Sequence, residues 1–224
     1  MSAEEAGKLF IFGLLVCKTE VYIHSILEIR KRSASWRKDT QFLILVPEKT
    51  LTPQALERYG EYFSQEETLM ISSNLTKGQL FEAFEKIKSG KAKIIIGTRR
   101  AIFAPFQKLG LVVIDEEQDI SYKQWDMSPR YDARIVAERL SKIHKCNLVR
   151  GSATPSIESY YLAKNKKMKL LELPELKIPS LKTKPIETIV VDMKKEKWTG
   201  NFSCISKKLK AEIEYALKNK QQII

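Results

Sequence analysis

The sequence predicts an α/β fold, in which a doubly wound parallel sheet carries helices on both of its faces. Continuous apolar runs such as FLILV at 42–46, KIIIG at 93–97 and LVVID at 111–115 are typical of strands that are buried on both faces. Segments in which apolar residues have helical spacing lie between these runs. This alternation favours parallel strands that are joined by crossover helices.

These patterns place six strands and three helices in the first 150 residues. The strands are expected at Leu9–Val16, Phe42–Val46, Leu69–Ser72, Lys93–Gly97, Leu111–Ile114 and Asn147–Val149. One helix is expected over Glu20–Arg32 and another over Asp132–His144. Between them, Thr76 and Gln79 have the spacing of a capping box, which predicts a helix that begins after Thr76 and ends at Gly90.

The character of the sequence changes after the last of these strands. We expect residues 1–165 to form the main lobe, and residues 166–224 to contain a linker, a strand and an amphipathic helix. The linker is the proline-containing stretch 173–188. The strand is expected over Thr188–Asp192 and the helix over Ser206–Lys218.

Composition limits the classes of protein that fit. The 224 residues are 43% hydrophobic and contain no apolar run long enough to cross a bilayer, so we expect a buried core and no membrane span. The cysteines Cys17, Cys146 and Cys204 lie far apart in the sequence. Their spacing argues against a zinc site and against a disulfide framework, and it favours a cytoplasmic location.

The net charge of +12 indicates a polyanionic partner such as nucleic acid. A lysine-rich, solvated surface is the other interpretation, because much of the excess charge lies between Lys164 and the end of the chain. Charge alone does not decide between the two, so nucleic-acid binding needs support from specific residues.

Two polar segments follow expected strands and are suited to catalysis. Asp115 and Glu116 come directly after an apolar strand, which would place them at the edge of the sheet where α/β proteins bind ligands. In nucleotide hydrolases the first such carboxylate holds Mg²⁺ and the second acts on the attacking water. GSATPS at 151–156 offers hydroxyl groups after the next strand. The simpler interpretations are an acidic surface cap and an ordinary strand-to-helix turn.

Several segments, taken in their order and spacing, resemble the primosomal protein N′ (PriA) family of superfamily-2 DNA helicases. They are LVPEKTLTPQALERY, IIIGTRRAIFAPF, LGLVVIDEEQDISYKQ, PRYDARIVAERL and GSATPSIES. The resemblance extends over nearly all of residues 10–224. It implies a RecA-like first motor lobe of the P-loop NTPase type with ATP-dependent 3′→5′ helicase activity. It also implies a role in replication restart at forked or single-stranded DNA, with ATP and Mg²⁺ as cofactors.

The same resemblance assigns roles to individual residues. Lys18 and Thr19 would bind the nucleotide, and Thr19 would hold Mg²⁺ together with Asp115. The catalytic group would be Asp115, Glu116 and Gln118, and the group that couples hydrolysis to DNA movement would be Gly151, Ser152, Ala153 and Thr154. The DNA-binding residues would be Pro47, Thr52, Gln54, Gly97, Thr98, Arg99, Lys123, Trp125 and Arg130. Trp125 has two interpretations: it stacks on a base, or it packs beneath a surface loop.

The phosphate-binding loop departs from the family pattern GVTGSGKTEVY. This chain has FGLLVCKTEVY at 12–22, so Phe12, Leu15 and Cys17 stand where glycines are expected, although Lys18 is kept. Such side chains resist positive φ and fill space that phosphate oxygens need, so we expect weak or absent ATP binding. Another interpretation is that this run continues the preceding strand. Gln118 replaces a histidine of the family, which is a milder change.

The resemblance also implies parts that the chain does not contain: an N-terminal DNA-binding region, a second motor lobe with an arginine finger, and zinc-binding cysteines. We therefore interpret the chain as truncated, and expect a separate chain to be one source of the second lobe. Two functions are considered. One is an ATP-dependent helicase lobe, and the other is a non-catalytic descendant that binds DNA or a partner without hydrolysis.

Overall fold

The computed structural model describes residues 8–12, 15–32, 39–50, 53–173 and 188–223 of the 224. The chain divides into two compact units, unit 1 (Met1–Glu175) and unit 2 (Leu176–Ile224).

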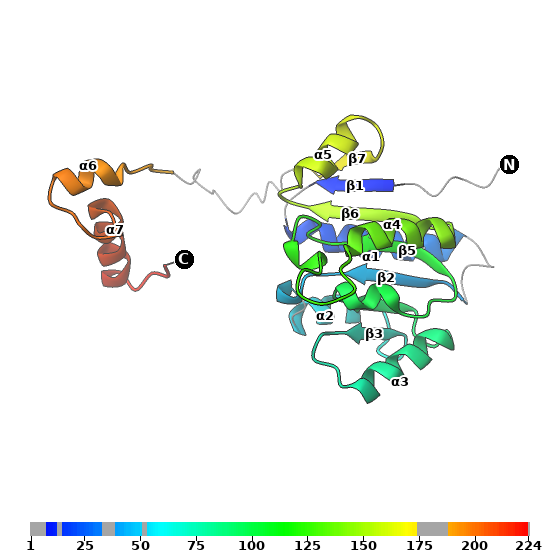
Figure 1. Ribbon diagram of the computed structural model, residues 1–224. Helices are drawn as coiled ribbons and strands as arrows, with labels where there is room; N and C mark the ends of the chain where they lie inside the picture. Colours follow the sequence, from blue (N-terminus) through cyan, green and yellow to red (C-terminus); the bar gives the residue numbers. More distant parts are fainter. Residues whose placement is uncertain (1–7, 13–14, 33–38, 51–52, 174–187, 224) are drawn as a thin grey trace. The chain divides into compact units, whose positions relative to one another are not determined.

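Unit 1 is built on a parallel sheet, which confirms the fold class predicted from the sequence. Within the described residues, seven strands are arranged in the order β3-β4-β2-β5-β6-β1-β7, and each neighbouring pair is parallel (Figure 1). The strands are β1 (Lys8–Phe12), β2 (Gln41–Leu45), β3 (Thr68–Ile71), β4 (Ile94–Gly97), β5 (Leu109–Ile114), β6 (Asn147–Ser152) and β7 (Lys169–Glu172).

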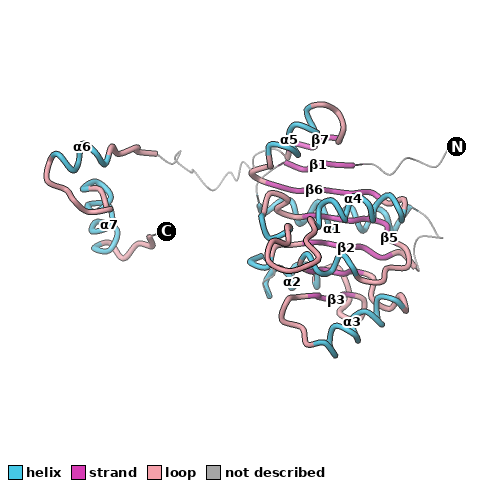
Figure 2. Tube along the Cα trace, in the orientation of Figure 1, coloured by secondary structure: helices cyan, strands magenta, loops and turns pink. Residues whose placement is uncertain are grey.

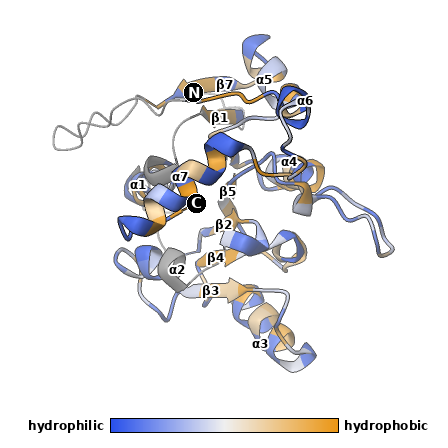
Figure 3. Cartoon of the chain, turned by 90° about the vertical axis from the view of Figure 1, so that its left-hand side faces the viewer, coloured by the Kyte–Doolittle hydropathy of each residue, from blue (hydrophilic) through white to orange (hydrophobic). Residues whose placement is uncertain are grey.

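Helices cover both faces of this sheet (Figure 2). They are α1 (Leu15–Arg32), α2 (Pro53–Gly60), α3 (Lys77–Lys88), α4 (Ala133–His144) and α5 (Ile157–Lys164), with short 3-10 helices η1 (Glu48–Thr50), η2 (Arg99–Phe103) and η3 (Ile120–Tyr122). Leu43 of β2 belongs to a core cluster that contains Ala137 of α4, whereas the next residue, Ile44, belongs to the opposite cluster with Ile23 of α1. The inner strands are apolar at successive positions because both faces are covered. In Figure 3, most of the length of β3 and β4 is hydrophobic.

Several helix ends agree with the expectations from the sequence. Helix α3 begins after Thr76, whose capping box with Gln79 is formed in both directions, and Gly90 follows the helix with φ of +71°. Helix α4 begins after Asp132, whose side chain accepts a hydrogen bond from the backbone N–H of Arg134. These local signals set the boundaries because each satisfies backbone groups that a helix end leaves unpaired.

The strand expected at Leu9–Val16 is too long, and the helix expected from Glu20 begins too late. β1 ends at Phe12, the last residue that pairs with β6 and β7, and α1 begins at Leu15. The run that precedes Lys18 therefore does not continue the strand. A short apolar run does not distinguish a buried strand from a buried helical turn, and the boundary was misplaced for that reason.

The region after α5 also differs from expectation. Unit 1 extends past residue 165, because β7 pairs with β1 along the edge of the sheet. The strand expected at Thr188–Asp192 is wrong: these residues have no regular structure, and the Asp192 side chain caps helix α6 (Met193–Trp198). The expected helix is confirmed as α7 (Lys207–Lys218), with Ser206 as its N-cap. Most of the proline-containing stretch lies outside the described residues.

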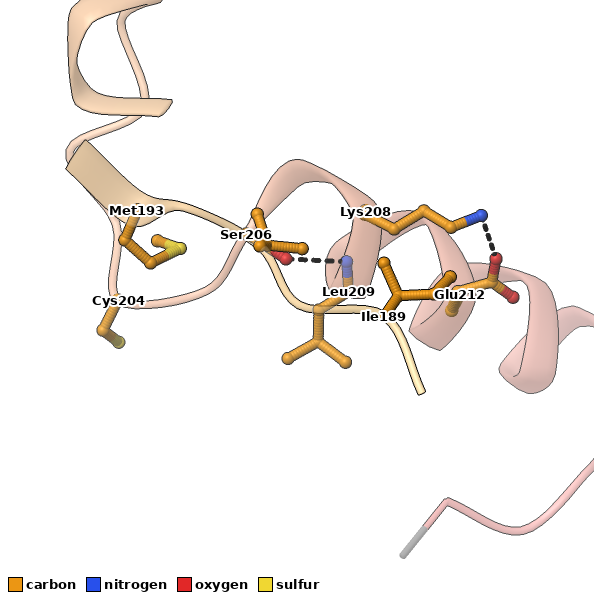
Figure 4. Close-up of a pocket in the computed structure, with 8 residues that line it drawn as sticks. Ile189, Met193, Cys204, Ser206, Lys208, Leu209 and Glu212 are labelled. Carbon is orange, nitrogen blue, oxygen red and sulfur yellow. Dashed lines mark hydrogen bonds and ion pairs between the residues drawn. The ribbon is translucent and has the colours of Figure 1, made fainter. Parts of the chain in front are cut away.

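Unit 2 contains a pocket of about 600 Å³ between the start of α7 and the segment before α6 (Figure 4). Ile189 and Leu209 supply apolar lining, and Lys208 Nζ lies 2.7 Å from Glu212 Oε1 at its rim. Across the described residues, every helix is too short or too polar to span a bilayer.

Candidate functional site

The candidate site lies at the carboxyl ends of β5, β6 and β1, which are neighbours in the sheet (Figure 1). Parallel strands bring their carboxyl ends to one edge, and α/β proteins bind ligands there. β5 leads directly into Asp115, β6 ends at Ser152, and β1 precedes the helix that carries Lys18. The sheet thus brings the expected nucleotide-binding, catalytic and coupling residues together.

Lys18 is a fully buried cation in this site. Its exposed fraction is 0%, and its Nζ lies 2.6 Å from Glu116 Oε1 and 3.5 Å from Asp115 Oδ1. A buried ammonium group needs such partners, because its desolvation is otherwise very costly. Thr19, the next residue, is partly buried.

Two tyrosines hold Asp115. Tyr22 donates a hydrogen bond to Asp115 Oδ1 at 2.9 Å, and Tyr122 donates to the Asp115 carbonyl oxygen at 2.5 Å. Burial raises the pKa of the Asp115 carboxyl, while the charge of Lys18 and the hydrogen bond from Tyr22 act in the opposite direction. Burial, followed by the nearby Asp115 charge, raises the pKa of Tyr22 well above its usual range, so its hydroxyl stays protonated and donates.

A chain of hydrogen bonds continues from Glu116 to β6. Gln118 Nε2 donates to Glu116 Oε2 at 2.9 Å, and Ser152 Oγ donates to Gln118 Oε1 at 2.5 Å. The backbone N–H of Thr154 then donates to Ser152 Oγ at 3.0 Å. We refer to Lys18, Glu116, Gln118 and Ser152 as the relay, because each contacts the next. The relay connects the start of α1 to the end of β6.

Backbone geometry holds the acidic residues in place. Glu116 has φ of +45°, a left-handed conformation that is unfavourable for a residue with a side chain. Gly151, the first residue of the GSATPS segment, lies within β6 and not in the turn that follows it. A Cβ at Gly151 would lie only 1.7 Å from Tyr22 Oη. Gly151 therefore makes room for the tyrosine that holds Asp115.

The residues expected to contact DNA fall into a buried group and an exposed group. In the buried group, Thr98 is 2% exposed, and its hydroxyl has no hydrogen-bond partner among the residues that the structure describes. Gly97 ends β4, where a Cβ would lie 2.6 Å from the Ile71 carbonyl oxygen, so its small size is needed for packing. Pro47 is also buried.

Arg99 lies between these groups and is partly buried, with Nη1 donating to the Ser121 carbonyl oxygen at 2.8 Å. Thr52 and the side chain of Gln54 lie outside the described residues.

The exposed group lies on a loop that is closed by a bridge between Lys123 and Asp132. Trp125 is 61% exposed, and Lys123 Nζ lies 3.9 Å from the centroid of its ring. Arg130, five residues further along the same loop, is also exposed. Of the two interpretations of Trp125, this arrangement favours stacking, because the ring is accessible to solvent. Cationic side chains beside an exposed aromatic ring suit single-stranded nucleic acid.

Three residues of the site were not identified from the sequence: Tyr22, Tyr122 and Glu117. Tyr22 carries a usable signal, since it lies four residues after Lys18 and thus on the same face of α1. The other two contact the site through the folded arrangement of the chain, which periodicity does not reveal. Among the described side chains, no group of three or more His, Cys, Asp or Glu is placed to hold a metal ion.

A family model described as DEAD/DEAH box helicase matches residues 17–162. The replication restart protein PriA of Bacillus subtilis is 37% identical over 207 residues, which are 92% of this chain and 24% of that protein. PriA of Rickettsia prowazekii is 39% identical over 207 residues, 92% of this chain and 30% of that protein. The chain thus spans about a quarter to a third of the length of these relatives.

Solved structures show likeness in fold. The C-terminal domain of S. cerevisiae Dbp5 aligns with a TM-score of 0.51 and 13% identity, covering 75% of this chain and 90% of that domain. The helicase domain of Pyrococcus furiosus Hef aligns with a TM-score of 0.50 and 17% identity, covering 76% of this chain and 35% of that one.

Replacement of Gly151 by alanine should disrupt the site, because the new Cβ would displace Tyr22 and break its hydrogen bond to Asp115. We expect the free energy of unfolding to fall by about 2–3 kcal/mol, as for other overpacked positions. Adding Tyr22→Phe should recover part of this loss, because it removes the hydroxyl oxygen. The nearest ring atom, Cζ, would then lie 2.9 Å from the new Cβ. Urea denaturation of the single and double variants measures both effects.

Gly78→Ala serves as the control, because Gly78 lies in α3 with open space around its Cα. Its helix position predicts a gain of about 1 kcal/mol. Wild-type stability in Gly151→Ala would show that the contact with Tyr22 does not shape the site.

Proposed function

We propose that this chain acts as the first motor lobe of a PriA-like DNA helicase. The chain belongs to the DEAD/DEAH box helicase family, and 92% of its own length matches PriA. Its substrate would be single-stranded or forked DNA, and its process would be replication restart. Other parts of such a helicase, in the same polypeptide or in a separate chain, would complete the site for hydrolysis.

The relay is the observation that carries this proposal. It extends from the lysine expected to bind phosphate, through the acidic residues, to the SAT residues 152–154. A motor lobe has to transmit the state of its nucleotide to the elements that move along DNA. A continuous series of short polar contacts between those two places supports that role, because a change at one end alters the partners at the other.

Each residue of the site would have a defined task. Lys18 and Thr19 would contact phosphate, and Thr19 and Asp115 would hold Mg²⁺, which when bound neutralises charge on the phosphate oxygens. Glu116 would orient the attacking water and accept its proton. Gln118 would transmit a change of partner at Glu116 to Ser152, since its amide contacts both.

The donor groups fit a magnesium nucleotide, but the loop that precedes them fits it less well. An amine and two carboxylates meet at the ligand-binding edge of the sheet. Phe12, Leu15 and Cys17, however, replace three glycines, and α1 already begins at Leu15. A phosphate group would also have to compete with Glu116 for Lys18. We therefore propose that the nucleotide binds more weakly than in a lobe with the full glycine loop.

This loop supports a second candidate function, in which the lobe binds DNA without hydrolysing ATP. The exposed Trp125 beside Lys123 supports DNA contact in either case. The two functions therefore differ at the nucleotide site and agree at the DNA-binding loop.

Asp115→Asn separates the two functions, because it removes a charge from the site while keeping the shape of the side chain. For a catalytic lobe, single-stranded DNA should stimulate ATP hydrolysis once a PriA-type second lobe is supplied to the purified chain, and this variant should abolish the activity. Undetectable nucleotide binding at millimolar ATP, with salt-sensitive DNA binding retained, would contradict the catalytic function and support the second one.

Trp125→Ala should weaken DNA binding in both cases, whereas Trp198→Ala in unit 2 provides an exposed control.

Grafting the glycine loop tests the cause of weak nucleotide binding. Replacing FGLLVC at 12–17 by GVTGSG should tighten the binding of magnesium ATP by about tenfold or more, equivalent to roughly 1.4 kcal/mol, because backbone N–H groups become free to surround the phosphates. Isothermal titration calorimetry measures the change. The same graft combined with Lys18→Ala is the control and should lose the gain. An unchanged affinity in the graft alone would place the defect elsewhere.

A further inference from the structure

Glu117 lies between two members of the relay, Glu116 and Gln118, but its side chain contacts a different element. Its exposed fraction is 1%, and its carboxylate accepts hydrogen bonds at the start of α5. Ser156 donates to Oε1 from its backbone N–H at 2.8 Å and from its hydroxyl at 2.9 Å, and Ser159 Oγ donates to Oε2 at 2.7 Å. A residue of the acidic turn (115–118) is thus bound to the first turn of a separate helix.

The main chain of Glu117 is also held. Its N–H donates to the Gly151 carbonyl oxygen at 3.0 Å, and its carbonyl oxygen accepts from Arg134 Nη1 at 3.0 Å. Arg134 is itself fixed by Asp132, with Nε–Oδ1 and Nη2–Oδ2 distances of 2.9 and 2.7 Å. Elements β6, α4 and α5 therefore all contact this one residue.

Capping of α5 alone does not account for the buried carboxylate. Ser156 already acts as the N-cap, since its hydroxyl accepts from the Ser159 N–H at 3.3 Å. Burying a carboxylate is costly even when hydrogen bonds satisfy it, and a serine cap works without one. What Glu117 adds is a connection between the helix and the acidic turn.

This connection runs beside the one through the relay. Gln118 contacts Ser152 at the end of β6, and Glu117 contacts Ser156 and Ser159 in the following turn and helix. With the Gln118 contact alone, the residues that follow Ser152 would be free to pivot when Glu116 changes its partners. The contacts at Ser156 and Ser159 add a second attachment, which ties the acidic turn to the start of α5.

We propose that Glu117 is a positioning residue that fastens α5 to the acidic turn, so that a change at Glu116 displaces the helix as a unit. The biological meaning of this coupling rests on the proposed function, in which nucleotide binding would be the change at Glu116. The coupling itself is a property of the chain and is measurable without any ligand.

Backbone amide chemical shifts of the isotope-labelled full chain test the proposal. Glu116→Gln alters the relay with little change of shape, and it should shift the amide signals of residues 157–160 in α5. In a Glu117→Gln background the same substitution should lose most of this effect. If Glu117→Gln does not fold, Ser159→Ala takes its place, because it removes one of the contacts and keeps the charge. Local loosening would change the signals of α5 but would not remove their response to Glu116.

Glu138→Gln is the matched control. Glu138 accepts a hydrogen bond from Arg150, which donates to the same Ser159 that binds Glu117, so this variant disturbs the start of α5 while leaving the Glu117 carboxylate in place. The response of α5 to Glu116→Gln should therefore persist in that background. A full response in the Glu117→Gln background, or none in the wild-type background, would overturn the proposal. Failure to bind single-stranded DNA would instead contradict the proposed function and leave the coupling result standing.

Discussion

The buried contact between Lys18 and the carboxylates of Asp115 and Glu116 is the interaction on which the rest of the site depends. The ammonium group has no exposed surface, and burial of either sign of charge without a partner would cost several kcal/mol. The contact requires that α1 follows β1 at the right distance and that β5 ends beside it. The parallel sheet meets this requirement by bringing the carboxyl ends of neighbouring strands to one edge.

Other features of the site follow from keeping these charges in place. Tyr22 binds Asp115 from the same helix that carries Lys18, and Gly151 lacks a side chain because the tyrosine occupies that space. Glu116 accepts a left-handed backbone, which directs its carboxylate toward Lys18 and Gln118. Under the proposed function, phosphate would replace a carboxylate as the partner of the lysine. The arrangement also stabilises the fold when no nucleotide binds, which gives one physical reason for Lys18 to persist beside a loop without its glycines.

Much of the fold was predictable because its signals are local. The apolar strands, the Thr76 capping box and the start of α4 at Asp132 each satisfy a rule that needs only neighbouring residues. The start of α1 was misplaced because the apolar run before Lys18 suits a strand and a helix alike. In the site, the resemblance identified the relay residues, whose meeting the structure describes. It did not identify Glu117 or Tyr122, because their partners lie far away in the sequence and only the folded chain brings them close.

The central claim is that Lys18 neutralises a buried acidic pair, and one set of stability measurements tests it most directly. Urea denaturation should show that Lys18→Met lowers the free energy of unfolding by about 3–5 kcal/mol, because it leaves one buried and one partly buried carboxylate without a counter-charge. Adding Asp115→Asn and Glu116→Gln to this variant should restore most of the loss. A Lys18→Met protein as stable as the wild type, or a triple variant no more stable than Lys18→Met alone, would contradict the account.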